Sequence, residues 1–359
     1  MAETNILSLK PSDTKKAVIA CIKAGENVAL VSAPGSGKTS IVGQASAELG
    51  YDLLVSLPAI EDSTEPGGLP DLSGQTAYAD KKLFRTAYMA TQAKKPTVWH
   101  LEDFGQAHDS VQKAYMQWAL AREVDGKRLP DHVSITMATN RRIDKAGVLG
   151  ILEPVKGRFT LIHMRSDLDD FCQNLFDRGK TEYKLSDDAI TLGCAFLRFR
   201  TELLNAFTPT ADMTNSPTER NWVSAFRHTD AQVPGHVEHA LVAGRVGTGA
   251  ATEFIAFLKI WRSMPSLDAI LADPAHAPIP DRQALSALYA VSVGLAAKAN
   301  PANFDRVRVY AERLEKARLG EFAVLMVRDS VRRENKIGST RAWIEMTTGP
   351  VGKLMGGRE

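Results

Sequence analysis

The chain has 359 residues, of which 44% are apolar and 24% are charged. These proportions are typical of a globular protein with a sizeable buried core, and the length suits two or three domains. Basic residues number 44 and acidic residues 42, so the net charge neither favours nor excludes nucleic acid as a partner.

Cysteine use and hydropathy indicate the compartment. The three cysteines, Cys21, Cys172 and Cys194, are odd in number and far apart, so they suggest neither a disulfide framework nor a metal site. Such usage is typical of a reducing environment. No apolar run has the length of a signal-peptide core or of a membrane span. We therefore expect a soluble protein of the cytoplasm.

A helix is predicted within residues 1–26, with Ser12 or Asp13 as its N-cap and Gly25 at its end. The stretch NVALVSAPGSGKTS, residues 27–40, then reads as a short buried strand, a glycine-rich turn and the start of a helix. This order of elements is the context of a phosphate-binding P-loop.

The residue types in this loop match the chemistry of phosphate binding. Gly35 and Gly37 let the backbone bend so that successive N–H groups point at phosphate oxygens. Lys38 supplies a positive charge for the β- and γ-phosphates, and the Thr39 hydroxyl can hold Mg²⁺. The following helix directs its positive dipole end at the same anion. Ser32 stands where the pattern has its first glycine, but Gly-Lys-Thr after a hydrophobic strand still predicts nucleotide binding.

A second strand is predicted over residues 52–57, and a long loop rich in proline and glycine follows it. Loops of this length are usually functional or mobile. This one is either a surface insertion or an element that handles substrate. A helix is predicted next, over residues 82–93.

The third predicted strand, residues 96–101, ends in two carboxylates, Glu102 and Asp103. A P-loop ATPase needs such a pair beside its phosphates, one for Mg²⁺ and one for the attacking water. We assign Glu102 to the magnesium and Asp103 to the water, although the usual order is Asp then Glu. If the register shifts by one residue, Asp103 takes the magnesium and Phe104 replaces the base. His100 reads as a packed core histidine rather than a ligand.

A helix over residues 109–122 is predicted to lead through a hairpin at Asp125-Gly126 to a fourth strand, residues 133–138. Asn140 follows this strand, where it would sense the γ-phosphate or orient water, unless it only forms a strand-end turn.

The fifth predicted strand covers residues 160–164, directly after Gly157-Arg158-Phe159. From Asp167 onward the apolar periodicity is helical, with Ser186 as a cap. Further helices are predicted over residues 218–229, 250–260, 281–299, 304–314 and 321–333, with a proline-marked linker from Pro265 to Pro280. Arg332-Arg333 indicates a solvated helix end rather than a nucleic-acid site.

These motifs resemble those of the AAA+ ATPases, and most closely those of the MoxR-like branch. APGSGKTS resembles the Walker A box, VWHLEDFGQA the Walker B box, ATNRR the sensor-1 segment and KGRF the arginine-finger stretch. LPAIEDSTEPGGLPDLSG resembles the insert that MoxR-like proteins carry after their second strand. TERNW resembles the sensor-2 segment, with Glu219 where a proline usually precedes the arginine. The resemblance covers about residues 10–260.

The resemblance implies a set of site residues. The catalytic set would be Glu102, Asp103, Asn140 and Arg158, with Arg158 acting on ATP bound to the neighbouring subunit and Arg141, Arg142 or Arg165 as substitutes. ATP would be held by Pro34, Gly35, Ser36, Gly37, Lys38, Thr39, Ser40 and the lid arginine Arg220. Mg²⁺ would be held by Thr39 and Glu102.

The resemblance also implies an architecture and an activity. Residues 1–166 would form an α/β P-loop AAA+ core, a five-stranded parallel sheet with helices on both faces. Residues 167–263 would form an all-α lid, and residues 264–359 a C-terminal helical extension. The protein would hydrolyse ATP as a ring of about six subunits that remodels other proteins, with a von Willebrand factor A domain protein as partner. The alternatives are a nucleic-acid motor or loader on the same scaffold, and a small-molecule P-loop kinase, which would need neither lid arginine nor inter-subunit finger.

Overall fold

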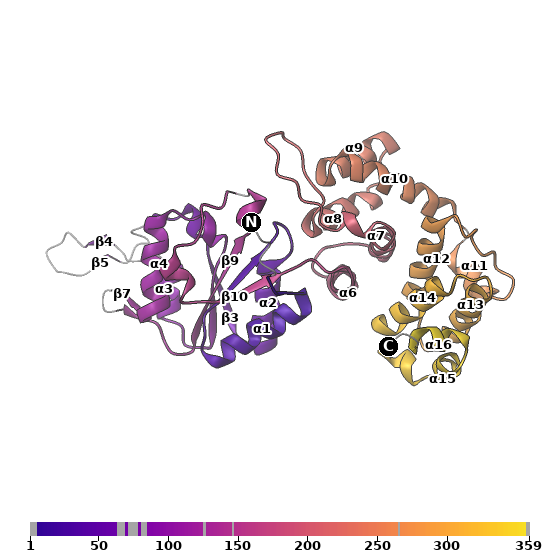
Figure 1. The fold of residues 1–359 in the computed structure, drawn as a ribbon, viewed down its shortest axis with the longest axis horizontal. Helices are drawn as coiled ribbons and strands as arrows, with labels where there is room; N and C mark the ends of the chain where they lie inside the picture. Colours follow the sequence, from indigo (N-terminus) through magenta and orange to yellow (C-terminus); the bar gives the residue numbers. More distant parts are fainter. Residues whose placement is uncertain are drawn as a thin grey trace. The chain divides into compact units, whose positions relative to one another are not determined.

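The computed structural model describes residues 6–62, 69–70, 78–79, 85–124, 127–145, 147–264 and 266–356 (Figure 1). Most of the loop predicted after the second strand lies outside these residues, as does the Asp125-Gly126 turn. The chain forms two compact units. The first comprises Met1–Asp167 with Phe207–Ala211, and the second Leu168–Ala206 with Asp212–Glu359.

The first unit is built on a six-stranded sheet in the order β1-β10-β2-β9-β6-β3, with every neighbouring pair parallel. The predicted α/β fold with a parallel sheet is confirmed. The sequence predicted five strands, because β1 is too short for any periodicity to mark it. The strands are β1 (Ser8–Leu9), β2 (Val28–Ser32), β3 (Asp52–Ser56), β6 (Thr97–Leu101), β9 (Val133–Asn140) and β10 (Thr160–Met164).

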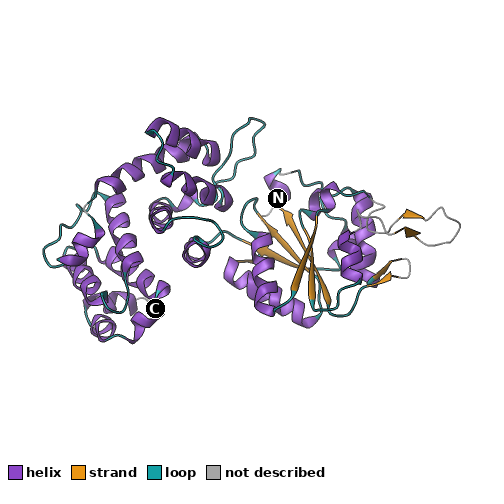
Figure 2. Cartoon of the chain, turned by 180° about the vertical axis from the view of Figure 1, so that it is seen from behind, coloured by secondary structure: helices purple, strands orange, loops and turns teal. Residues whose placement is uncertain are grey.

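Helices cover both faces of this sheet, as predicted (Figure 2). Alternate residues of β2 point to opposite faces, so Val28 and Leu30 join one hydrophobic core and Ala29 the other. The first core includes residues of α1 and α2, and the second includes residues of α3, α4 and α5. The helices are α1 (Pro11–Ala24), α2 (Lys38–Leu49), α3 (Arg85–Thr91), α4 (Asp109–Ala121) and α5 (Glu153–Lys156).

The cap predicted for the first helix is wrong. α1 begins at Pro11, and its N-cap residue is Lys10, which makes no side-chain capping bond. Proline suits the first helical position because its fixed φ matches a helix and its missing N–H would have no partner there. Ser12 and Asp13 therefore fall inside the first turn. Gly25 ends the helix in the left-handed conformation, as predicted.

The predicted hairpin before the fourth strand is present. β7 (Glu123–Val124) pairs antiparallel with β8 (Lys127–Arg128), on either side of the turn that lies outside the described residues. A second short antiparallel pair joins β4 (Leu69–Pro70), within the long loop predicted after the second strand, to β5 (Tyr78–Ala79), which follows that loop.

The second unit is helical. The predicted Ser186 cap of α7 is confirmed, because its side chain accepts a hydrogen bond from the Ala189 N–H. Two hydrophobic cores lie along this unit, and α12 contributes to both. The linker predicted from its prolines contains a helix, α11, and no predicted helix corresponded to α9, α15 or α16. The helices are α6 (Leu168–Arg178), α7 (Asp187–Phe199), α8 (Glu219–Phe226), α9 (Gly235–Val246), α10 (Thr248–Ser263), α11 (Leu267–Ala272), α12 (Leu285–Lys298), α13 (Phe304–Lys316), α14 (Gly320–Arg333), α15 (Arg341–Thr348) and α16 (Pro350–Gly356).

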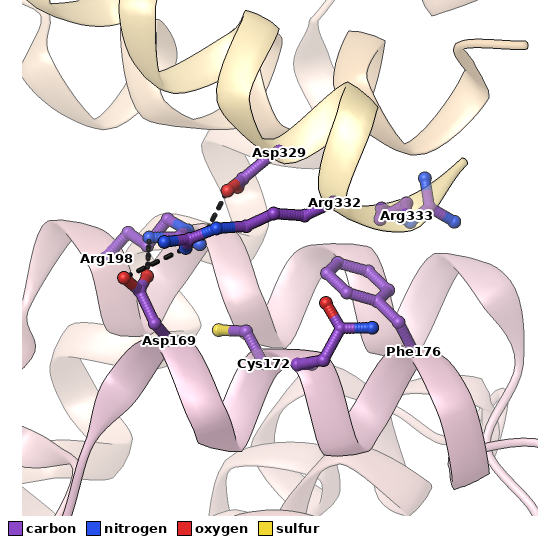
Figure 3. Close-up of a pocket in the computed structure, with 8 residues that line it drawn as sticks. Asp169, Cys172, Phe176, Arg198, Asp329, Arg332 and Arg333 are labelled. Atoms are coloured by element: carbon purple, nitrogen blue, oxygen red, sulfur yellow. Dashed lines mark hydrogen bonds and ion pairs between the residues drawn. The ribbon is translucent and has the colours of Figure 1, made fainter. Parts of the chain in front are cut away.

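An ion-pair cluster joins α6, α7 and α14 (Figure 3). The Arg198 guanidinium donates to Asp169 at 3.0 Å and to Asp329 at 2.9 Å, and Arg332 pairs with Asp169 at 2.9 Å. Burial raises the pKa of Asp329, and the charge of Arg198 opposes that rise. These contacts tie the region predicted as a lid to the region predicted as an extension.

Arg333 does not form the solvated helix end that the sequence indicated. Its guanidinium lies over the Phe176 ring, 4.3 Å from the centroid, and donates to the Ala296 carbonyl at 3.1 Å. A cation over an aromatic face is an attractive contact that this arginine makes within the fold.

No helix among the described residues has the length and apolar character needed to span a bilayer.

Candidate nucleotide-binding site

The strand order brings three predicted motifs to one edge of the sheet. β9 lies between β2 and β6, and all three strands run in the same direction. Ser32 at the end of β2 is in register with Asn140 at the end of β9, and Leu101 at the end of β6 pairs with Met137. The carboxyl ends of parallel strands are where α/β folds bind ligands. The P-loop, Asn140 and the two carboxylates after β6 therefore converge.

The glycine-rich turn has the backbone that a phosphate cradle requires. Gly35 and Gly37 have φ values of 72° and 90°, a region that side-chain-bearing residues rarely adopt. Gly37 is the N-cap residue of α2 and makes no side-chain capping bond. The first N–H groups of a helix have no partners within it, so those of α2 are available to an anion.

The departure at Ser32 is accommodated inside the loop. Ser32 is fully buried, and its Oγ lies 2.5 Å from the Ser36 Oγ. The Ser36 hydroxyl also contacts the Ala33 carbonyl at 2.9 Å. The extra side chain thus forms part of the hydrogen bonding that shapes the loop.

Lys38 and Asn140 meet across the site. Lys38 is 6% exposed, and its ammonium donates to Asn140 Oδ1 at 2.7 Å and to the Ala33 carbonyl at 3.3 Å. The Asn140 amide in turn donates to Asp103 Oδ1 at 3.4 Å. One amide therefore links the P-loop lysine to the carboxylate predicted to handle water.

Thr39 and Glu102 also meet at this edge of the sheet. The Thr39 hydroxyl donates to Glu102 Oε2 at 2.5 Å, and His100 Nε2 lies 3.0 Å from the same oxygen. Burial by itself would raise the pKa of this carboxylate, but its hydrogen bonds from His100 and Thr39 and the nearby Lys38 charge hold it below its usual value. The carboxylate therefore stays ionised at neutral pH.

The donor set fits magnesium. A hydroxyl and an ionised carboxylate are the hard oxygen ligands that Mg²⁺ prefers, and the ion usually completes its shell with water and substrate phosphates. Thr39 and Glu102 supply those two groups, in contact with each other. In the described part of the chain, no group of three or more His, Cys, Asp or Glu side chains is placed to hold a metal. The phosphates of a nucleotide would have to complete this site.

The two carboxylates lie in different positions. Glu102 follows β6 directly, and its backbone N–H donates to the Ser56 carbonyl at 2.9 Å. Asp103 adopts the left-handed conformation with φ 47°, which turns the chain into a short 3₁₀ turn, Phe104–Gln106. The Phe104 side chain is 1% exposed and packs in the core of the first unit. Phe104 thus lies in the core, and Asp103 lies beside Asn140.

Two features of this site were not found from the sequence. His100 was interpreted as a core histidine, and it is indeed buried, but it also contacts Glu102. Their spacing of two residues across the end of β6 was the available signal, because alternate residues of an extended chain share a face. Gly105 also matters, since a Cβ there would lie 2.2 Å from Thr139 Oγ1. No sequence pattern marks so close an approach.

Arg158 lies at the opposite end of the sheet from the P-loop. The Asn27 side chain donates to the Arg158 carbonyl at 3.3 Å, and the Thr160 N–H donates to the Asn27 carbonyl at 2.9 Å. Asn27 precedes β2, whereas the P-loop follows it. The Arg158 side chain is exposed and donates to the Pro154 carbonyl at 3.4 Å. Among the described residues it forms no ion pair.

All three substitute fingers follow the carboxyl ends of strands, at the P-loop edge of the sheet. Arg141 follows β9 and makes a two-pronged ion pair with Asp144, at 2.9 and 2.7 Å. Arg165 follows β10, and its guanidinium lies 3.4 Å from Asp167. Arg142 begins the short turn after β9 and is exposed.

Arg220 belongs to the second unit, and its role at the nucleotide remains a prediction. It is exposed in the first turn of α8. Glu219, the residue that departs from the sensor-2 pattern, is buried and accepts a hydrogen bond from Asn205 at 2.6 Å.

Comparison with known proteins adds a distant likeness. No family model and no curated protein sequence matches the chain. Solved structures that resemble it include RuvB of Thermotoga maritima, a Holliday junction branch migration motor, which is 15% identical. That alignment covers 86% of each chain with a TM-score of 0.40. A variant of the same protein is also 15% identical over 79% of this chain and 80% of its own, with a TM-score of 0.41. Likeness at this level does not carry function, so the activity rests on the site's own geometry.

Proposed function

We propose that the chain is a magnesium-dependent AAA+ ATPase that works as a ring and remodels other proteins. The observation that carries this proposal is the contact network at the strand ends. Lys38 reaches Asp103 through Asn140, and Thr39 contacts Glu102. A cation, a hydroxyl and two carboxylates at the mouth of a P-loop are the groups that ATP hydrolysis requires.

The phosphate-binding groups are the α2 N-terminus and Lys38. Lys38 exchanges its bond to Asn140 Oδ1 for phosphate oxygens when nucleotide binds, because the stronger negative charge attracts it more. Thr39 and Glu102 would hold Mg²⁺, which would neutralise negative charge on the bound phosphates.

The hydrolytic groups are Asp103 and Asn140. Asp103 accepts a proton from the attacking water and orients it, which requires an ionised carboxylate near the γ-phosphate. The Asn140 amide contacts Asp103 and Lys38 at once. It therefore couples the position of the base to the state of the phosphate-binding lysine, which is the task of a γ-phosphate sensor.

The ring follows from the resemblance and from the place of Arg158. An exposed guanidinium at the end of the sheet opposite its own P-loop suits ATP bound to a neighbouring subunit. About six subunits, a protein substrate and a von Willebrand factor A domain partner are what the MoxR-like motifs imply. Arg220 in α8 is the lid arginine that the resemblance of TERNW to the sensor-2 segment implies.

The test measures ATP hydrolysis with and without Mg²⁺, and then its stimulation by candidate partners. We expect magnesium-dependent release of inorganic phosphate that DNA does not stimulate. An Asp103→Asn variant trapped with ATP should retain a protein substrate in affinity capture. Stimulation by DNA, with nucleic acid retained instead, would identify a nucleic-acid motor on the same scaffold. A phosphorylated small-molecule product would identify a kinase.

A further inference from the structure

The buried imidazole of His100 contacts the candidate magnesium carboxylate. His100 Nε2 lies 3.0 Å from Glu102 Oε2, and the His100 side chain is fully buried. From this contact we infer that His100 is a positioning residue that holds the Glu102 carboxylate in place for Mg²⁺. The inference rests on the proposed ATPase function and gives a role at the site to His100, which was interpreted from the sequence only as a packed core histidine.

Glu102 needs a positioning residue because its side chain is more flexible than that of aspartate. The resemblance leads one to expect aspartate at this position, and glutamate is longer by one methylene and one rotatable bond. Each extra rotamer must be excluded before the carboxylate can serve as a ligand. A hydrogen bond from a rigid neighbour on the same strand face excludes them.

The geometry around His100 suits this task. His100 Nδ1 lies 2.8 Å from the Thr136 hydroxyl, and the two residues are direct partners across β6 and β9. The ring is therefore fixed from the opposite side by a buried partner. Thr39 and His100 both contact Oε2 of Glu102, and in the described part of the chain Oε1 accepts no hydrogen bond. One carboxylate oxygen is anchored and the other is left for a ligand.

If His100 had only a structural role, its loss would affect stability and not the magnesium requirement. Its loss would lower stability through an unsatisfied Thr136 hydroxyl and a packing defect, but the magnesium requirement would not change. A positioning residue changes the metal affinity itself, typically by roughly 10–100-fold when such an outer partner of a metal ligand is lost.

The experiment titrates Mg²⁺ against binding of a fluorescent, non-hydrolysable ATP analogue. In His100→Leu we expect half-maximal enhancement of binding at roughly 10–100-fold higher Mg²⁺ than in the wild type. Binding in EDTA should be unchanged. His100→Gln keeps a side-chain N–H donor, so its shift should be much smaller. Val98→Ala, a buried residue on the same strand and face, is the matched control and should lower the melting temperature without changing the Mg²⁺ requirement.

Three outcomes would decide the matter. A His100→Leu protein that melts at a lower temperature but keeps the wild-type Mg²⁺ requirement would overturn the inference. If that variant does not fold, Thr136→Val, which frees the ring's other nitrogen, should shift the requirement in the same direction, and no shift would overturn it. A wild-type protein that binds no analogue even at saturating Mg²⁺ would instead contradict the proposed function itself.

Discussion

Replacing Arg158 by alanine tests whether each nucleotide site spans two subunits. Arg158 lies beside Asn27, before β2, and the P-loop begins after Ser32. Five residues of strand at about 3.3 Å each separate the two ends by roughly 16 Å, which is well beyond the length of an arginine side chain. Arg158 therefore cannot serve the P-loop of its own subunit.

The expected loss is large and confined to turnover. Arginine fingers contribute roughly 10³ to 10⁵ in rate, which corresponds to about 4–7 kcal/mol of barrier. The planar guanidinium is always charged and matches the charge that develops on the γ-phosphoryl oxygens. ATP binding, measured by calorimetry, should stay within a few-fold of the wild type.

The assay mixes Arg158→Ala subunits with Lys38→Ala subunits, each nearly inactive alone. With equal amounts and random assembly, about one quarter of the junctions in a ring combine an intact P-loop with an intact finger. Phosphate release should recover toward that fraction. A mixture of Lys38→Ala subunits with Asp103→Asn subunits is the matched control. Each of these changes disables the P-loop site of the subunit that carries it, so no junction in a mixed ring has an intact site. No recovery in co-assembled Arg158→Ala and Lys38→Ala rings would refute the reasoning.

Three further predictions concern the carboxylates Asp103, Glu102 and Asp169. Asp103→Asn should keep Mg²⁺-ATP binding while hydrolysis falls roughly 10²–10⁴-fold, because the amide cannot accept a proton, and Glu102→Gln should instead raise the Mg²⁺ requirement at least about tenfold. If binding and single-turnover assays showed the opposite effects for the two variants, Asp103 would be the magnesium ligand and Glu102 the base. Burial alone would raise the pKa of Asp169, but Arg332 and Arg198 hold this pKa below its usual value. The ionised Asp169 carboxylate therefore stabilises the fold near neutral pH, and this contribution is lost as the pH falls through the folded-state pKa. The gap in unfolding free energy between wild type and Asp169→Asn should accordingly narrow from about pH 7 to about pH 3, and a constant gap in urea titrations would contradict the assignment.

The strands that carry the site could be predicted because hydrophobic runs ending in polar residues mark buried parallel strands. The structure places Lys38, Asn140 and Glu102 together because β9 lies between β2 and β6, an order that no local pattern encodes. β1 has two residues, too few for periodicity.

Side-chain contacts were the least predictable feature. Ser12 and Asp13 have the chemistry of caps, yet Pro11 begins α1 and places its N-cap at Lys10, two or three residues earlier. Arg333 belongs to a charged pair in the sequence, but its place over Phe176 depends on how α14 packs on α6. The two-residue spacing of His100 and Glu102 suggested a shared face, but the sequence does not show that the two side chains are in contact.

The central claim is that this P-loop binds the phosphates of a nucleotide through Lys38. Isothermal titration of wild type, Lys38→Ala and a surface control, Lys23→Ala, with Mg²⁺-ATP tests it most directly. Lys38 is the buried cation of the loop, whereas Lys23 is exposed in the last turn of α1. We predict that the wild type and Lys23→Ala bind one nucleotide per subunit and that Lys38→Ala shows almost no binding heat. An unchanged ATP affinity in folded Lys38→Ala would contradict the account.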